Sequence, residues 1–312
     1  MEQRMVGAAR RGWRRGTFVP YLYLAPLALG TALFTLIPAL YNVYISFTNF
    51  GMFHFRQFDF VGLENYLEIF STGSAFVPVL TWTVIWTVLT SFCNIAAGLF
   101  LALLLNNPQL RERNLYRTLL ILPWALPNII TIQMWAGLLA FDQGAVNLLL
   151  KMLGLAPVRW LSDPFWARVS LLMVNLWLSY PFFMTIFLAA LQSIPAELYE
   201  AAALDGAGRW ARFRLITFPL LTIATIPLTI SQLAFQFNNF GIVYLLTGGD
   251  PLAYPGADYG LTDILVTYMY KLMRDSQRYG LTAAYGMLLF LVIAAFTYVN
   301  ARLTRAFEEK ER

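Results

Sequence analysis

The chain contains 312 residues, of which 59% are hydrophobic, 16% are aromatic and only 12% are charged. Soluble globular domains carry roughly twice that charged fraction, so the composition excludes an ordinary soluble protein and indicates a membrane protein. The net charge of +5 reflects an excess of Lys and Arg on one side of the predicted membrane helices. We therefore expect no nucleic-acid partner.

Long stretches without Asp, Glu, Lys or Arg occur at 16–55, 69–110, 118–141, 169–196, 215–249 and 279–301. Each reaches the roughly 20 apolar residues that cross a bilayer as a helix. The sequence therefore predicts an all-α protein with transmembrane helices near 18–50, 76–105, 119–141, 169–191, 215–246 and 281–301. These six spans form one membrane domain at 17–306, between a basic tail at 1–16 and a second tail at 307–312.

The Lys and Arg residues predict the orientation of the chain. With the N-terminus inside, the cytoplasmic segments hold 15 of these residues and the opposite side holds 7. The positive-inside rule then places both termini, and the loop at 194–214, in the cytoplasm.

The sequence lacks the residues that several kinds of active site require. Cys93 and His54 are the only cysteine and histidine, so neither a disulfide nor a metal site is expected. No Gly-Lys pair occurs, so the phosphate-binding loop of ATP-hydrolysing proteins is missing. We expect a transport subunit that is not an enzyme, has no catalytic residue and holds no cofactor. If ATP and Mg²⁺ drive transport, they bind to partner subunits.

The predicted spans contain no ionisable residue away from their ends. Proton-coupled carriers need an ionisable relay inside the membrane, so proton-driven transport is not expected. Sodium coupling remains open, because carbonyl and hydroxyl oxygens at broken helices can bind that ion. The substrate is expected to be neutral, since a buried anion without a fixed cation is costly.

Neutral polar and aromatic side chains recur at helical spacing on three predicted spans. They are Trp124 and Asn128, then Asn175, Ser179 and Phe182, then Gln232, Gln236 and Asn239. Within each group the spacing of four or seven residues places the side chains on one helix face. Pro123 and Pro127 each remove a backbone hydrogen bond beside the first group. Such faces suit a sugar, whose hydroxyls bond amides and whose rings stack on aromatic groups. The alternative is that these amides only hold helices together.

The loop at 194–214 reads IPAELYEAAALDGAGRWARFR. Acidic residues at its start and basic residues after it fit the dipole of a short helix that ends at Gly206. An ordinary cytoplasmic loop with an amphipathic helix is the plain interpretation. The spacing from Glu200-Ala201-Ala202 through Gly206 to Pro219, however, resembles the EAA loop of ABC importer permeases.

Longer segments resemble the sugar permeases of this ABC importer family, in particular those for maltose and maltodextrin. These segments are LLILPWALPNII, WLSDPFWARVSLLMVNLWLSYPFFM, FQFNNFGIVYLLTGGDP and GLTDILVTYMY. The resemblance implies the core of a type I importer in a bacterial cytoplasmic membrane. It also implies a second permease subunit, two ATPase subunits inside, a sugar-binding protein outside and an oligosaccharide substrate.

The resemblance assigns roles to individual residues. Sugar contact falls on the eight side chains named above from their spacing. Coupling to an ATPase falls on Glu197, Glu200, Ala201, Ala202, Asp205 and Gly206. Several sugar positions, Trp124 and Phe182 among them, differ from those of enterobacterial maltose permeases, so the sugar itself stays open. Trehalose or another disaccharide is one alternative, and glycerol phosphate is weaker because no cation meets its charge. An ion-coupled secondary transporter and a purely structural subunit are the alternatives of other classes.

Overall fold

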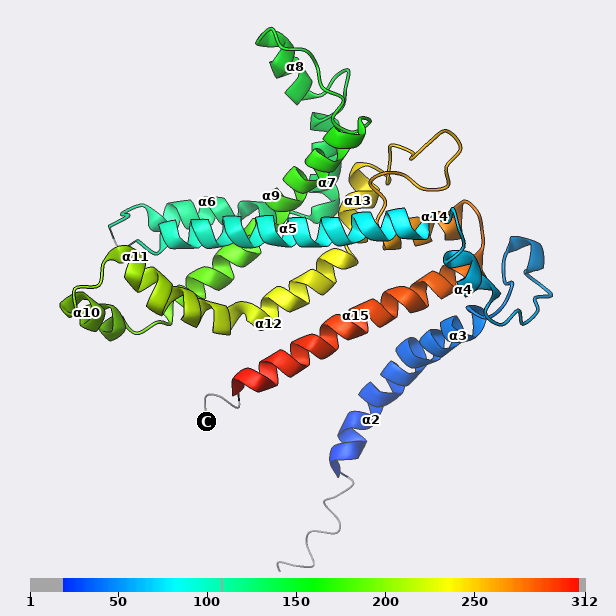
Figure 1. The fold of residues 1–312 in the computed structure, drawn as a ribbon, viewed down its shortest axis with the longest axis horizontal. Helices are drawn as coiled ribbons and strands as arrows, with labels where there is room; N and C mark the ends of the chain where they lie inside the picture. The colour runs from blue at the N-terminus through cyan, green and yellow to red at the C-terminus, as the bar shows by residue number, and fades with distance from the viewer. Residues whose placement is uncertain (1–18, 108, 309–312) are drawn as a thin grey trace, which may run out of the picture.

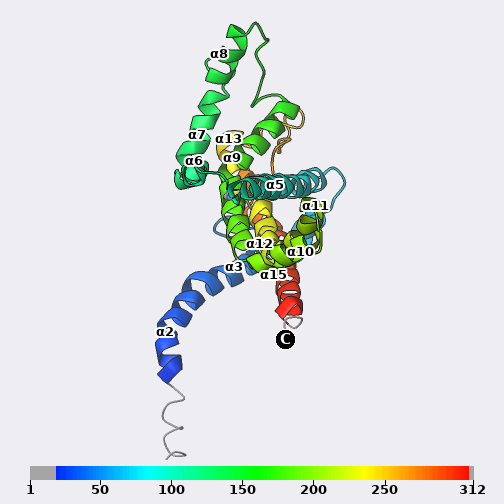
Figure 2. The ribbon, with the colours of Figure 1, turned by 90° about the vertical axis from the view of Figure 1, so that its left-hand side faces the viewer.

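A computed structural model describes residues 19–107 and 109–308, with the backbone alone for 19, 20 and 304–308. The predicted basic tail and most of the predicted C-terminal tail lie outside these residues. The described chain is helical, and its β pairing is limited to the isolated bridges Thr48–Phe60 and Leu252–Gly260. Figure 1 shows long helices that extend from a short helix on the left to loops on the right, and Figure 2 shows that the N-terminal helix reaches away from the others.

The described residues contain five helical segments long and apolar enough to cross a membrane, and a bent helix pair supplies a sixth. This agrees with the predicted six spans. They are α2 (Val19–Thr31) with η2 (Ala32–Leu36) and α3 (Ile37–Ile45); α5 (Phe76–Leu105); α6 (Arg113–Ala125) with α7 (Asn128–Leu138); α9 (Pro164–Gln192); α11 (Arg209–Arg212) with η4 (Phe213–Thr217), α12 (Phe218–Phe237) and α13 (Phe240–Leu246); and α15 (Tyr279–Glu308).

Short helices connect these spans. They are η3 (Met52–His54), α4 (Glu64–Ile69), α8 (Ala145–Met152), α10 (Ala196–Leu204) and α14 (Leu265–Arg274). In Figure 1, α10 lies at the left end of the fan, while α4 and α14 lie at the right end. If 194–214 is cytoplasmic, as its charges predict, α4 and α14 are therefore on the outer side. The helix α14 packs its apolar face on α15 and α5.

The third span is broken, so the prediction of one continuous helix at 119–141 is wrong. α6 and α7 meet at an angle of 91°. Leu126 is extended at φ −85° and ψ 146°, as expected for a residue before proline, and Pro127 cannot donate a backbone hydrogen bond. Asn128 therefore begins a new helix and does not share a face with Trp124.

The fifth span is also interrupted, where a continuous helix to 246 was predicted. α12 ends at Phe237 and α13 begins at Phe240. Asn239 has φ −81° and ψ 72° and precedes the first turn of α13. It therefore does not continue the helix face of Gln232 and Gln236, and the predicted spacing of seven residues does not apply there.

Among the described helices, α5 and α9 share the most extensive packing. A Cβ built on Gly98 of α5 would lie 2.8 Å from Met184 N and 2.9 Å from the Phe183 carbonyl carbon. Glycine thus lets two long helices approach to backbone contact, as small residues do between membrane helices. The helix α12 packs beside this pair, and α15 packs on α12. The helix α2 reaches away, so α3 is the part of the first span that lies against α15.

Candidate functional site

Four amide side chains meet where α5, α9 and the break between α12 and α13 come together. Asn94 Nδ2 donates to Asn175 Oδ1 at 3.0 Å, and Asn175 Nδ2 donates to Gln236 Oε1 at 3.2 Å. Asn239 Nδ2 donates to the same Gln236 oxygen at 2.9 Å. Asn94, Asn175 and Gln236 are buried, and Asn239 is half-buried. We call these four residues the amide cluster.

The amide cluster brings together three residues predicted from spacing and adds Asn94, which was missed. The same rule applied to α5 would have found it, because Thr87, Ser91 and Asn94 stand at i, i+4 and i+7. Among the described residues, neither Ser91 Oγ nor Asn94 Oδ1 has a hydrogen-bond partner, although both are buried. Buried polar atoms normally have hydrogen-bond partners, so these two oxygens of α5 are free to accept further hydrogen bonds.

The break at the end of α12 is held by α5. Trp86 is fully buried, and its Nε1 donates to the Gln236 carbonyl at 3.2 Å. At this helix end the Gln236 carbonyl also accepts from Asn239 N at 3.3 Å, so the indole is its second donor. Trp86 therefore positions the backbone that carries Gln236 and Asn239.

The other predicted sugar residues lie around this region with less contact. Trp124 is exposed, and its ring lies 6.3 Å from that of Phe182 at 57°. Ser179 and Gln232 are half-buried, and Asn128 is exposed at the start of α7. The structure thus joins Trp124 to Phe182 and Asn175 to Gln236 and Asn239. It shows no hydrogen bond that ties Asn128, Ser179 or Gln232 to them within the described residues.

The predicted coupling residues form or flank α10. Ala207 N donates to Ala202 O at 2.8 Å, and Gly206 N donates to Ala203 O at 3.1 Å. Gly206 has φ +78°, so the helix ends in a Schellman motif that needs a left-handed residue. Tyr199 Oη and Thr217 Oγ1 share a hydrogen bond of 2.9 Å that ties α10 to η4.

The surface of α10 is open. Glu197, Glu200 and Asp205 are exposed, and so is Leu204 at 90%. An exposed leucine beside carboxylates on a helix pinned at one point gives a surface suited to helix-in-groove contact.

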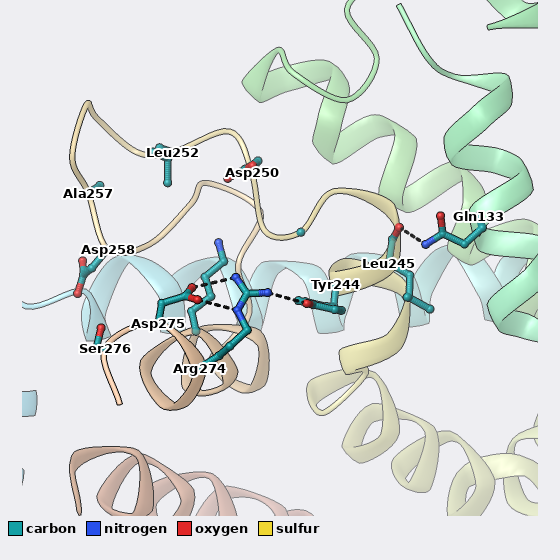
Figure 3. Close-up of a pocket in the computed structure, with 12 residues that line it drawn as sticks. Gln133, Tyr244, Leu245, Asp250, Leu252, Ala257, Asp258, Arg274, Asp275 and Ser276 are labelled. Atoms are coloured by element: carbon teal, nitrogen blue, oxygen red, sulfur yellow. Dashed lines mark hydrogen bonds and ion pairs between the residues drawn. The ribbon is translucent and has the colours of Figure 1, made fainter. Parts of the chain in front are cut away.

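On the side opposite α10, a cavity of about 540 Å³ opens between α13, α14 and the loop that joins them (Figure 3). Its lining is Gln133, Tyr244, Leu245, Gly248, Asp250, Leu252, Ala257, Asp258, Lys271, Arg274, Asp275 and Ser276. Arg274 binds Asp275 through Nε and Nη2, and its Nη1 donates to Tyr244 Oη at 2.7 Å. The hydrogen bonds between this pair raise the pKa of Arg274 and lower that of Asp275, so both stay charged.

The same loop is anchored by a buried ion pair. Lys271 Nζ donates to Asp263 Oδ2 at 2.7 Å, and Gly260 N donates to that oxygen at the same distance. Burial raises the pKa of the Asp263 carboxyl, while Lys271 acts in the opposite direction. A side chain at Gly249 would collide with this pair.

The described residues contain no group of three or more His, Cys, Asp or Glu that could hold a metal ion. The polar groups present are amides, hydroxyls, aromatic rings and paired charges. They can bind a polar neutral molecule through hydrogen bonds and stacking.

Known proteins resemble this chain along most of its length. The profile of the family described as "Binding-protein-dependent transport system inner membrane component" matches residues 94–309. The chain is 38% identical over 298 residues to the galactooligosaccharides transport system permease protein GanP of Bacillus subtilis, covering 93% of this chain and 71% of GanP. It is 36% identical over 306 residues to the maltodextrin transport system permease protein MdxF of the same organism, covering 94% of this chain and 70% of MdxF.

A solved structure shares the fold. It is a bacterial ABC transporter involved in the import of the acidic polysaccharide alginate, with a TM-score of 0.78 at 24% identity. The match covers 97% of this chain and 99% of that one. The breaks after α6 and α12 therefore occur in a chain with the overall architecture of an importer permease.

Proposed function

The chain belongs to the family of inner membrane components of binding-protein-dependent transport systems, and we propose that it forms the sugar site of an ATP-driven importer of maltodextrin-type oligosaccharides. The amide cluster is the observation that carries this proposal. It places four neutral donor and acceptor groups where three membrane helices meet, and the predicted spans hold no charge away from their ends. Amide groups of this kind match sugar hydroxyls, which both donate and accept hydrogen bonds.

Within the amide cluster, Gln236 Oε1 accepts from Asn175 and Asn239, whereas Asn94 Oδ1 has no partner among the described residues. In the proposed cycle, sugar hydroxyls replace the bonds that Gln236 Oε1 accepts from Asn175 and Asn239. Exchange of one neutral hydrogen bond for another has a small net cost, so the site can both bind and release. Trp124 and Phe182 supply ring faces on which a sugar stacks, and Asn128, Ser179 and Gln232 complete the lining.

The name GanP favours a second candidate sugar for this chain. That relative carries galactooligosaccharides, and its identity to the chain is similar to that of MdxF. Galactooligosaccharides and maltodextrins are both neutral, so the uncharged spans fit either one. Stimulation of ATP hydrolysis by one sugar and not the other distinguishes the two candidates.

The coupling proposal rests on α10. Its exposed acidic residues and Leu204 dock in a groove of an ATPase subunit on the cytoplasmic side. The proposed contact set is Glu197, Glu200, Ala201, Ala202, Asp205 and Gly206. ATP and Mg²⁺ bind to the ATPase pair, whose closure moves α10 as a rigid body and changes access to the amide cluster. A second permease and an extracytoplasmic sugar-binding protein complete the complex, and both termini of this chain lie in the cytoplasm.

The test is ATP hydrolysis by the reconstituted complex with its binding protein and a set of sugars. Maltose and maltodextrins are expected to stimulate hydrolysis, and Gln236→Ala and Asn239→Ala are expected to abolish that response. Gln192→Ala, an exposed amide at the end of α9, is the matched control and should respond normally. Stimulation by galactooligosaccharides alone would reassign the sugar. Sugar uptake by this chain without an ATPase would refute the proposal.

Coupling has its own variants. A Glu200→Ala, Gly206→Pro double variant should lose sugar-stimulated hydrolysis, because it removes the acid and breaks the helix end. Glu112→Ala changes an exposed acid just before α6 and should keep it. Normal stimulation in the double variant would show that α10 is not the coupling element.

A further inference from the structure

The cavity between α13, α14 and their connecting loop points to a second sugar-binding position, and we propose that it holds the outer end of a neutral oligosaccharide whose inner end reaches the amide cluster. This inference rests on the proposed function and extends it. The cavity lies beyond the amide cluster on the side opposite α10, which the charge distribution places outside the membrane (Figures 1 and 3).

The helix α13 runs from the amide cluster to the cavity, and α7 packs beside it. α7 begins at Asn128 and carries Gln133, whereas α13 begins beside Asn239 and carries Tyr244. Gln133 Nε2 donates to Leu245 O at 3.1 Å, so the two helices are joined where the cavity opens. At about 1.5 Å per residue, Tyr244 lies roughly 8 Å further along α13 than Asn239. A ligand that occupies both sites must be longer than this separation. A monosaccharide is too short, whereas an extended oligosaccharide is long enough.

The lining has the groups that bind sugars in proteins. Planar side chains with paired donors or acceptors, here Arg274, Asp275 and Gln133, match neighbouring hydroxyls on a pyranose ring. The guanidinium of Arg274 keeps N–H groups beyond the three that Asp275 and Tyr244 accept. Tyr244 is packed against Phe240, with ring centroids 4.9 Å apart at 16°, so its aromatic face is held in place. The exposed carboxylate of Asp250 faces the same space from the loop (Figure 3).

The charges select the class of sugar. Three carboxylates line the cavity, on Asp250, Asp258 and Asp275, against two cations on Lys271 and Arg274. Lys271 is already paired with the buried Asp263. The cavity therefore presents excess negative charge and repels an acidic sugar, although the solved transporter that shares this fold carries the acidic polysaccharide alginate.

The loop around the cavity is rigid enough to hold a ligand. The Lys271–Asp263 pair and the Gly260 N–H fix the end of the loop on α14. Thr262 Oγ1 donates to Asp250 O at 2.6 Å, which holds the two sides of the loop together below Asp250. A preorganised pocket needs less ordering when sugar binds.

The experiment compares uptake of maltose and maltoheptaose by proteoliposomes that contain the full complex and its binding protein. Arg274→Gln and Asp250→Ala remove two different parts of the cavity. Each is expected to lower the ratio of maltoheptaose to maltose uptake about tenfold, since each loses hydrogen bonds from a charged group. Maltose has two glucose units against seven, so its uptake is expected to depend less on the cavity and to stay within twofold of the wild-type rate.

Arg278→Gln is the matched control. Arg278 lies four residues beyond Arg274, is equally exposed and also pairs with a carboxylate, that of Glu68, but it does not line this cavity. Its ratio should equal that of the wild type. An unchanged ratio in both cavity variants, or an equal fall for both sugars, overturns the inference while the proposed function stands. If the wild type transports neither sugar, the proposed function fails and the inference fails with it.

Discussion

The close approach of α5 and α9 gives a substitution whose effect can be worked out from the structure. In Gly98→Ala, the new Cβ would lie 2.8 Å from Met184 N and 2.9 Å from the Phe183 carbonyl carbon, besides meeting Phe183 Cβ. Two of these atoms belong to the α9 backbone, so no side-chain rotation relieves the contact and the helices must separate. Overpacking of this kind costs about 1–3 kcal/mol, and the better helix propensity of Ala offsets about 1 kcal/mol at most.

Separation of the two helices should also lengthen the hydrogen bond from Asn94 to Asn175 in the amide cluster, because this bond crosses the interface one turn before Gly98. Gly98→Ala is therefore expected to lower the midpoint of thermal unfolding by several degrees and to weaken sugar-stimulated ATP hydrolysis. Unfolding can be followed by reaction of a thiol-sensitive fluorophore with Cys93, the only cysteine of the chain.

The matched control for this substitution is Gly137→Ala. Gly137 lies inside α7, and a Cβ there would have no atom within 4 Å, so the change should leave the midpoint equal or slightly higher. The reasoning is refuted if Gly98→Ala and Gly137→Ala unfold at the same temperature.

Three further substitutions test other parts of the fold. Trp86→Phe should lower stability by about 1 kcal/mol, since the buried Gln236 carbonyl loses the indole donor and keeps only the Asn239 N–H, at 3.3 Å. Trp210→Phe, at an exposed site, should leave stability unchanged, as thermal unfolding would show. Asp263→Ala should lower the free energy of unfolding by about 3 kcal/mol, because Lys271 loses its buried partner. Limited proteolysis of the loop at 248–260 should become faster, and an unchanged cleavage rate would argue that the ion pair does not anchor this loop. Gly206→Ala should cost about 1 kcal/mol through its φ of +78° and speed amide exchange in α10, while Gly208→Ala, at φ −68°, should leave exchange unchanged.

The spans could be predicted because each needs a long apolar stretch, and such stretches can be identified from the sequence alone. The second predicted helix, at 76–105, coincides with α5. The fourth was predicted to begin at 169, after Arg168, yet α9 begins at Pro164. Asp163 Oδ1 accepts from Phe165 N and Trp166 N, a cap that the sequence shows as Asp followed by Pro. A charge at a helix end therefore marks the membrane boundary better than it marks the end of the helix.

The candidate site was predictable in composition but not in geometry. Helical spacing selected Asn175 and Gln236, which do bond each other, because both lie inside regular helices. It failed for Asn128, which follows a break in the helix. Asn239 does bond Gln236, but from the break after α12 and not along a continuous helix face. The burial of Trp86 and its bond to the end of α12 depend on contacts between segments 150 residues apart, which no local pattern records.

The two breaks restrict what can surround this chain in a membrane. Leu126 and Pro127 leave helical geometry in one span, and Asn238 and Asn239 do so in another; Asn128 and Asn238 are exposed in the isolated subunit. Irregular backbone at membrane depth is tolerated only where protein covers it or water fills the adjoining space. Lipid therefore cannot contact either break. Each break must therefore be covered by protein or face water, and the amides Asn128, Asn238 and Asn239 at the two breaks are polar groups suited to such surroundings.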